Sequence, residues 1–393
     1  MEVKEGYKQT DVGVIPEDWV VKKLGECLFK NPEYGINAPA VPLFGALPTY
    51  IRITDISDDG LFIKNDNVSV NHPQSELYFL EKGDLVFART GASVGKTYLY
   101  NQEDGKLVFA GFLIRIRPRQ KILDSKYLKF FTQTSLYWNW VGVNSMRSGQ
   151  PGINGHEYSQ LPIPFPPTKA EQTAIAAALS DADALIQSME KLIAKKRSIK
   201  QGAMQELLKP KKGWVVKKLG EIADINMGQS PSSSNYNASG VGLPLVQGNA
   251  DIDDRKTIIR NYTSQITKRC NNGDIIMSVR APVGEIALST FDACIGRGVC
   301  AISYPNAFLY HYLIFIESQW AKYSTGSTFD SVNSDTIWAL EINTPPPPEQ
   351  TRIAAILSDM DAEIAALETK LAKYKQIKEG MMQELLTGRI RLI

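Results

Sequence analysis

Residues 171–208, EQTAIAAALSDADALIQSMEKLIAKKRSIKQGAMQELL, recur as residues 349–386, EQTRIAAILSDMDAEIAALETKLAKYKQIKEGMMQELL. The two segments align without a gap and are identical at 23 of 38 positions. A shorter repeat, WVVKKLGE, stands at 19–26 and again at 214–221, at a different offset. Such a duplication indicates a chain built from two related halves. We expect a first variable domain at 1–165, a central helix at 166–212, a second variable domain at 213–344 and a distal helix at 345–393.

The two long repeats are predicted to be helices, because neither contains a proline and prolines stand just before each of them. Their apolar residues alternate at spacings of four and three, which is the narrow stripe of a coiled coil. At about 1.5 Å per residue each helix would be about 60 Å long, and we expect the two to pair antiparallel. The alternative is that each is a core helix of its own domain. The stripe consists of Ile175, Leu179, Ala182, Ile186, Met189 and Ile193 in the first helix, and of Ile353, Leu357, Met360, Ile364, Leu367, Leu371 and Tyr374 in the second.

Charge and composition exclude several classes of protein. The chain has 393 residues with 44 Lys and Arg against 42 Asp and Glu, which excludes a histone-like polycation. It contains no run of about 18 apolar residues, so we expect no membrane span, and the polar N-terminus is unlike a secretory signal. The cysteines show no C-x-x-C spacing and the three histidines lie far apart. This pattern predicts a reduced, cytoplasmic protein without a metal site.

The variable domains are predicted to be mixed and strand-rich. Short β-branched runs, such as Asp84–Phe87 and Asp274–Met277, stand between turn signals. One related stretch occurs in both domains, Gly83–Arg89 in the first and Gly273–Arg280 in the second, and it suggests that Arg89 and Arg280 are equivalent. We therefore expect an α+β fold with an internal pseudo-two-fold, in which two mixed, strand-rich domains are separated by two long helices paired as an antiparallel coiled coil.

Over essentially its whole length the chain resembles the specificity subunit of type I restriction–modification enzymes. The resemblance rests on the lead-in Tyr7–Thr10, Gly13–Pro16 and Asp18–Trp19, on the two Gly-Asp stretches, and on the helical segments Pro166–Leu208 and Pro347–Leu386. It implies two target recognition domains, each of which recognises half of a bipartite site in double-stranded DNA. It further implies that the helices set the spacer and dock methyltransferase subunits, and that motor-nuclease subunits join the complex.

The resemblance also implies that S-adenosylmethionine, ATP and Mg²⁺ belong to the partner subunits, so that this chain has no cofactor of its own and is not catalytic. No membrane partner is expected. The exposed seam of the helices is compatible with a homodimer of the isolated chain.

Four other functions have weaker support in the sequence. A P-loop-like ATPase would use Thr90–Thr97, but the first glycine of the P-loop pattern is displaced by one residue and a strand is predicted next. A self-sufficient nuclease would need a larger carboxylate set than Asp104-Gly105-Lys106. The proline segments at 165–168 and 344–347 lack the polar and aromatic residues of an adenine methyltransferase loop. A coiled-coil scaffold that binds only protein would not need arginine-containing polar loops in both domains.

Polar loops are the candidate DNA contacts, since Arg pairs with guanine, and Asn or Gln with adenine, in the major groove. The segment 145–155 is rich in glycine and polar, which suits a groove better than a core. The alternative for each residue is a solvated surface position or a local cap. The candidates in the first domain are Arg52, Arg89, Thr90, Ser93, Lys96, Arg147, Ser148, Gln150 and Asn154; those in the second are Gln247, Asn249, Arg280, Arg297, Lys322, Ser327 and Asn333.

Overall fold

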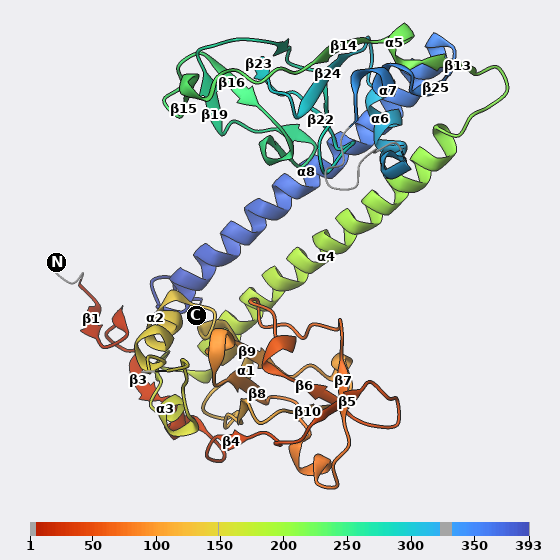
Figure 1. Ribbon diagram of the computed structural model, residues 1–393. Helices are drawn as coiled ribbons and strands as arrows, with labels where there is room; N and C mark the ends of the chain where they lie inside the picture. Colours follow the sequence, from red (N-terminus) through yellow and green to blue (C-terminus); the bar gives the residue numbers. More distant parts are fainter. Residues whose placement is uncertain (1–4, 148, 323–331, 393) are drawn as a thin grey trace. The chain divides into compact units, whose positions relative to one another are not determined.

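The computed structural model describes residues 5–147, 149–322 and 332–392, without the side chains of residues 321 and 322 (Figure 1). The chain divides into two compact units: residues 1–190 and 370–393 form the first unit, and residues 191–369 form the second. Each unit contains one mixed domain and a stretch of both long helices. In the described ranges no helix is long and apolar enough to cross a membrane.

The mixed domain of the first unit consists of two four-stranded sheets and short helices. One sheet has the order β4 (Glu33–Tyr34), β11 (Leu113–Ile116), β8 (Leu85–Ala88) and β9 (Thr97–Leu99). The other has the order β10 (Leu107–Phe109), β6 (Thr49–Ile51), β7 (Val68–Val70) and β5 (Ala40–Pro42), with β10 and β6 parallel. Two further pairs are β1 (Tyr7–Thr10) with β2 (Gly13–Pro16) and β3 (Val20–Lys23) with β12 (Pro162–Phe165). The helices are α1 (Ser125–Phe131), α2 (Ser135–Asn144) and α3 (Gly155–Ser159).

The second unit has the same plan with extra strands. Its six-stranded sheet has the order β14 (Asp224–Met227), β24 (Val299–Ser303), β21 (Ile275–Ser278), β22 (Ile286–Leu288), β18 (Lys256–Thr257) and β17 (Ile252–Asp253). Its five-stranded sheet has the order β15 (Tyr236–Asn237), β19 (Asn261–Thr263), β16 (Leu243–Val246), β23 (Ala293–Ile295) and β20 (Arg269–Cys270). Strand β13 (Val215–Lys218) pairs with β25 (Glu341–Thr344). The helices are α5 (Leu219–Ile222), α6 (Phe308–Phe315) and α7 (Ser334–Trp338).

The strand orders confirm the duplication that the sequence repeats predict. The series β4, β11, β8, β9 corresponds to β14, β24, β21, β22, and the series β5, β7, β6, β10 corresponds to β15, β19, β16, β23. In each domain the second sheet contains one parallel pair, β6 with β10 and β16 with β23. The predicted α+β class with two repeated domains is therefore correct.

Strand β8 is buried on both faces, which explains its continuous apolar sequence. Leu85 and Phe87 pack in the core that includes α1, whereas Val86 and Ala88 pack in the core between the two sheets. The equivalent strand β21 divides in the same way, with Met277 on one side and Ile276 on the other. This alternation follows from the two-residue period of a strand.

The long repeats form α4 (Lys169–Leu207) and α8 (Pro347–Leu385). In the first unit the amine of Lys378 lies 2.6 Å from Asp183, and that of Lys375 lies 2.7 Å from Glu190. In the second unit Lys196 lies 2.6 Å from Glu363 and Lys200 pairs with Asp361. In both units the residue numbers rise along one helix as they fall along the other. The helices are therefore antiparallel within each unit, as predicted.

The alternative prediction, that each long helix is a core helix of its own domain, is also correct for part of each helix. In the first unit Ile175 and Leu179 of α4 belong to the same core as Leu128 and Phe131 of α1. In the second unit Ile353 of α8 packs in one core with residues of α6. The helix ends are thus core elements of their own domains, and the predicted seam residues beyond them are buried or half-buried.

The second unit contains a buried histidine. His311 in α6 is 1% exposed, and its Nε2 lies 3.1 Å from the hydroxyl of Ser358. Burial, and then the nearby Lys200, lower the pKa of His311 from 6.5 to about 4, against an opposing effect of Asp361. The neutral form is therefore favoured in the folded unit.

We expect the free energy of unfolding of the second unit to fall as the pH falls from about 6.5 to about 4. In that range His311 binds a proton in the unfolded chain but not in the folded chain. The free energy of unfolding therefore falls by on the order of 3 kcal/mol. His311→Asn should remove this part of the dependence, as measured by denaturant unfolding at a series of pH values. The same change at the exposed His156 is the control. An unaltered pH profile in the His311 variant would contradict the assignment.

Candidate nucleic-acid interface

Two segments that the sequence singled out separately lie side by side in the first unit. The turn after β8, residues 89–96, contacts residues 149–154: the N–H of Gly91 donates to the carbonyl of Pro151 at 3.0 Å. The N–H of Ile153 donates to the carbonyl of Arg89 at 2.9 Å, and Thr90 forms an isolated bridge with Gly152. Together with Tyr34 and Phe112, these segments form what we call the first rim.

Arg89 is a half-buried cation of the first rim. Its guanidinium lies over the ring of Tyr34, 4.8 Å from the centroid, and it forms no ion pair with any described residue. Tyr34 is 43% exposed, and its hydroxyl accepts from the N–H of Gly155 at 3.0 Å. Phe112, whose carbonyl accepts from the N–H of Arg89, is 58% exposed. An uncompensated guanidinium over a partly exposed aromatic ring can contact a phosphate or a base edge.

Sequence reasoning did not find Tyr34 or Phe112. An exposed aromatic residue in a strand-rich domain has the same local pattern as a buried one, so the sequence carries no signal for it. Tyr34 is identified by its ring beneath the Arg89 guanidinium, and Phe112 by its backbone bond to Arg89 and its exposure.

Four other candidates of the first domain are already engaged within the protein. The Arg52 guanidinium binds both carboxylate oxygens of Asp55, at 2.9 and 2.8 Å, which raises the pKa of Arg52. Lys96 pairs with Asp58 at 2.7 Å, and Arg147 pairs with Glu157. The side chain of Asn154 caps α3 by accepting from the N–H of Glu157 at 2.9 Å. These contacts give all four residues a structural role.

The remaining candidates of the first domain differ in position. Gln150 is exposed, and its amide lies so close to Gly91 that a Cβ there would be 3.0 Å away. Thr90 and Ser93 are half-buried in the turn. Ser148 lies outside the described residues. Of the candidates within the first rim, Arg89, Thr90, Ser93 and Gln150 thus remain, since Lys96 and Asn154 are engaged within the protein.

The second domain has a rim at the same place of its sheet, but the predicted equivalence of Arg89 and Arg280 is wrong by one residue. The N–H of Val279 donates to Gly298 at 2.9 Å, and the carbonyl of Val279 accepts from Val332 at 3.0 Å. These are the bonds that Arg89 makes with Phe112 and Ile153. Val279, which is buried, is thus the equivalent of Arg89, and Arg280 is the equivalent of Thr90.

Residues 279–285, 296–298 and 247–249 form what we call the second rim. Gly298 approaches Gln247 so closely that a Cβ at position 298 would overlap the carbonyl oxygen of Gln247. Arg280 and Arg297 are exposed, and in the part of the chain that the structure describes neither forms an ion pair. Gln247 donates to the hydroxyl of Tyr236, and Asn249 donates to Glu285. The two arginines are therefore the free cations of this rim.

Asn333, a further candidate of the second domain, is not part of the second rim. Asn333 caps α7 by accepting from the N–H of Thr336 at 2.8 Å, which matches the role of Asn154 in the first domain. Ser327 and the side chain of Lys322 lie outside the described residues.

The segment Thr90–Thr97 does not have the geometry of a phosphate-binding loop. It forms a short 3₁₀ turn, Gly91–Ser93, and continues directly into β9. A P-loop needs a helix whose N-terminal amides face the phosphates. The segment Asp104-Gly105-Lys106, which partly matches a nuclease motif, has a structural role instead. The carboxylate of Asp104 accepts from the hydroxyl of Tyr98 at 2.7 Å and pairs with Lys64 at 2.9 Å.

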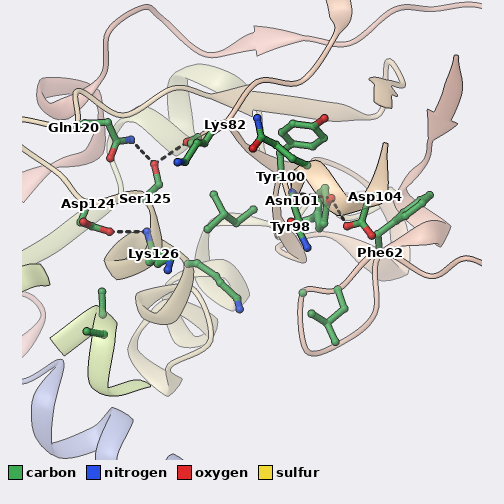
Figure 2. A pocket seen from close by; sticks show the side chains of 18 of the residues that line it. Phe62, Lys82, Tyr98, Tyr100, Asn101, Asp104, Gln120, Asp124, Ser125 and Lys126 are labelled. Carbon is green, nitrogen blue, oxygen red and sulfur yellow. Dashed lines mark hydrogen bonds between the residues drawn. The ribbon is translucent and has the colours of Figure 1, made fainter. Parts of the chain in front are cut away.

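A cavity of about 870 Å³ lies in the first unit (Figure 2), and no residue of the first rim lines it. It is bounded by β9 and the loop that follows, by the start of α1 and by the first turns of α4. Its labelled polar groups largely pair with one another: Tyr98 with Asp104, and Gln120 with Ser125. The predicted DNA contacts are not among its lining residues.

The described residues contain no cluster of three or more His, Cys, Asp or Glu side chains that could hold a metal ion. The four cysteines are free and buried. Burial raises the pKa of Cys27 to about 11 and that of Cys300 to about 12, so both thiols are protonated at neutral pH.

The chain thus contains two copies of one mixed domain, each with a polar rim at the same place of its sheet. The family model of the type I restriction modification DNA specificity domain matches residues 16–195 and 211–379. The chain therefore belongs to this family and carries two copies of its domain.

Individual relatives agree with the family assignment. A Methanocaldococcus jannaschii chain named for the specificity subunit of the type I restriction enzyme MjaX is 30% identical over 422 aligned positions, which cover 99% of this chain and 97% of that one. The MjaVIII specificity subunit of the same organism is 22% identical with the same coverage. The S subunit of a type I restriction–modification system from M. genitalium has the same fold, with a TM-score of 0.64 at 14% identity over 98% of both chains.

The protein is thus a DNA-recognition subunit of a type I restriction–modification system, as the sequence predicts. The ATPase, nuclease and scaffold alternatives are not supported.

Proposed function

We propose that each domain contacts one half of a bipartite DNA site through its own rim. The observation that carries this proposal is that the two rims have one framework and different side chains. Where the first rim has Arg89 and Phe112, the second has Val279 and Gly298. Where the first has Thr90 and Gly111, the second has Arg280 and Arg297. A shared backbone that presents different contact groups suits two half-sites of different sequence.

The long helices have a separate role in this proposal. Their antiparallel pairing within each unit supports the idea that α4 and α8 fix the number of base pairs between the half-sites and dock methyltransferase subunits. Motor-nuclease subunits would join this assembly for restriction. S-adenosylmethionine, ATP and Mg²⁺ would then be held by those partners, while this chain contributes recognition and no catalysis.

Two further expectations stay predictions. The four free, buried cysteines support a reducing compartment, and we place the protein in the cytoplasm together with the host DNA. A homodimer of the isolated chain is compatible with its long paired helices.

We expect Arg89→Ala to weaken recognition of the first half-site by about 1–3 kcal/mol, because Arg89 is the free cation of the first rim. Recognition of the second half-site should not change. Binding of the reconstituted complex to duplexes with one altered base at a time would measure both effects. Arg52→Ala is the matched control, since Asp55 already binds its guanidinium. An equal loss on all DNA sequences would assign Arg89 to a phosphate instead.

A further inference from the structure

Because the chain contains two related domains, the residues at equivalent positions of the two can be compared. The rims differ between the domains, yet Trp19–Glu26 and Trp214–Glu221 are identical at all eight positions. A core position can stay identical because its packing requires it. An exposed position that stays identical in both domains needs another cause.

Three of the eight positions of this repeat have a structural cause in each domain. Leu24 and Leu219 are fully buried. A Cβ at Gly25 would lie 3.0 Å from Ser159, and one at Gly220 would overlap the ring of Trp338. Trp19 and Trp214 pack on their own cores. These identities follow from packing.

The strand residues between them do not share this cause. Val20 in β3 is 45% exposed and Val215 in β13 is 56% exposed. Lys22 and Lys217 lie on the same strand face as these valines, because side chains alternate with a period of two. Neither lysine pairs with a carboxylate of any described residue. Lys22 is half-buried and its Nζ lies 5.3 Å from the centroid of the Phe165 ring, whereas Lys217 is exposed. Val21 is different, since it packs against the core of the first unit.

The neighbouring strands do not require the identity either. Val20 lies opposite Phe165 of β12, whereas Val215 lies opposite Thr344 of β25. A valine is therefore retained beside two chemically different cross-strand neighbours. Within the described ranges β3 and β13 each pair with one strand only, which leaves one edge of each open. An exposed β-branched edge strand promotes association unless something covers it.

We propose that Val20 with Lys22, and Val215 with Lys217, are two copies of one docking strip, each covered by one methyltransferase subunit. This inference rests on the proposed function, because it takes the number and kind of partners from it. A desolvated valine needs an apolar partner surface, and the adjacent lysine selects a carboxylate on that surface. Two identical strips on one chain fit two identical partner molecules. The retained valines favour a protein partner over DNA, because the phosphates of DNA offer no apolar surface to a valine.

The test is the stoichiometry of the complex formed by the full chain and its methyltransferase subunits, measured by native mass spectrometry. The wild-type chain should bind two subunits. The paired change Val215→Ser and Lys217→Glu should leave one, with affinity at the altered site lowered at least about tenfold. The change Val20→Ser and Lys22→Glu should also leave one, and both pairs together should abolish the complex. Thermal unfolding of each variant reports whether its domain stays folded. If the paired change at Val215 and Lys217 unfolds the second domain, the single change Lys217→Glu, which keeps the valine, is used instead.

Matched controls use exposed apolar residues elsewhere on the same domains. Leu77 is 67% exposed and Val241 is 58% exposed, and their changes to Ser should leave two subunits bound. Retention of two subunits by the folded double-strip variant would overturn the docking strip. Retention of both subunits with an equal loss of affinity for all DNA would also overturn it, and would assign the lysines to phosphate contacts. If the wild-type chain itself binds no methyltransferase subunit, the proposed function fails rather than this inference alone.

Discussion

Removal of seven residues from each long helix is expected to shorten the DNA spacer by about three base pairs and leave both half-sites unchanged. The segments 187–193 of α4 and 369–375 of α8 are suitable, because Glu190 and Lys375 within them form an ion pair. Seven residues preserve the spacing of the apolar stripe and shorten each helix by about 10 Å, which equals about three steps of B-DNA. Mapping of the sites methylated by the reconstituted complex would measure the new spacer.

Two controls separate helix length from helix disruption. Replacement of both segments by other helical heptads of equal length should leave the spacer unchanged. A deletion in α4 alone should destabilise the protein, because the pair of Asp183 with Lys378 and that of Lys196 with Glu363 could no longer form in the same register. A matched deletion that alters the recognised bases themselves would contradict this division of roles between helices and domains.

A single methyl group at Gly228 is expected to abolish recognition by the second domain. A Cβ at this position would overlap the carbonyl oxygen of Gly296 and lie 2.7 Å from that of Val299. Both are backbone atoms beside the second rim, so the strands themselves would have to move. We expect Gly228→Ala to lower the free energy of unfolding of the second unit by about 3 kcal/mol or more. Hydrogen exchange of each unit and half-site binding would measure the two effects.

The first domain offers the mirror experiment. A Cβ at Gly35 would overlap the carbonyl oxygen of Ala110, which is the equivalent contact, so Gly35→Ala should remove recognition of the first half-site only. Gly202→Ala is the control for the second unit, because nothing lies within 4 Å of its Cβ position and alanine favours a helix. Loss of both half-sites from either glycine change would show that the domains do not act independently.

The sequence was sufficient to predict the duplication, the α+β class and the two long helices. These features depend on long repeats and on apolar spacing, which persist over many residues and therefore average out local errors. The antiparallel pairing within each unit was also correct, since an apolar stripe on one helix needs a second stripe to cover it. The core role of the helix ends was harder to predict, because Ile175 and Leu179 serve both the stripe and the core of the first domain.

The rims were only partly predictable. Arg89 and Arg280 were matched by residue type, but strand register is set by the backbone ladder, and a slip of one residue moves a side chain to the other face. Matching the two arginines displaces the alignment by one residue, whereas the structural equivalent of Arg89 is the buried Val279. Ion pairs are equally invisible in the sequence: Lys96 and Arg147 were predicted as candidate DNA contacts, and the structure pairs them with Asp58 and Glu157.

The sites methylated by the complex of this chain with its methyltransferase subunits test the central claim most directly. The account predicts one bipartite sequence, with two short defined parts separated by a spacer of fixed length and free composition. In the same assay Arg89→Ala should relax one part, and Arg297→Ala the other. A single continuous recognition sequence, or relaxation of both parts by either change, would contradict the account.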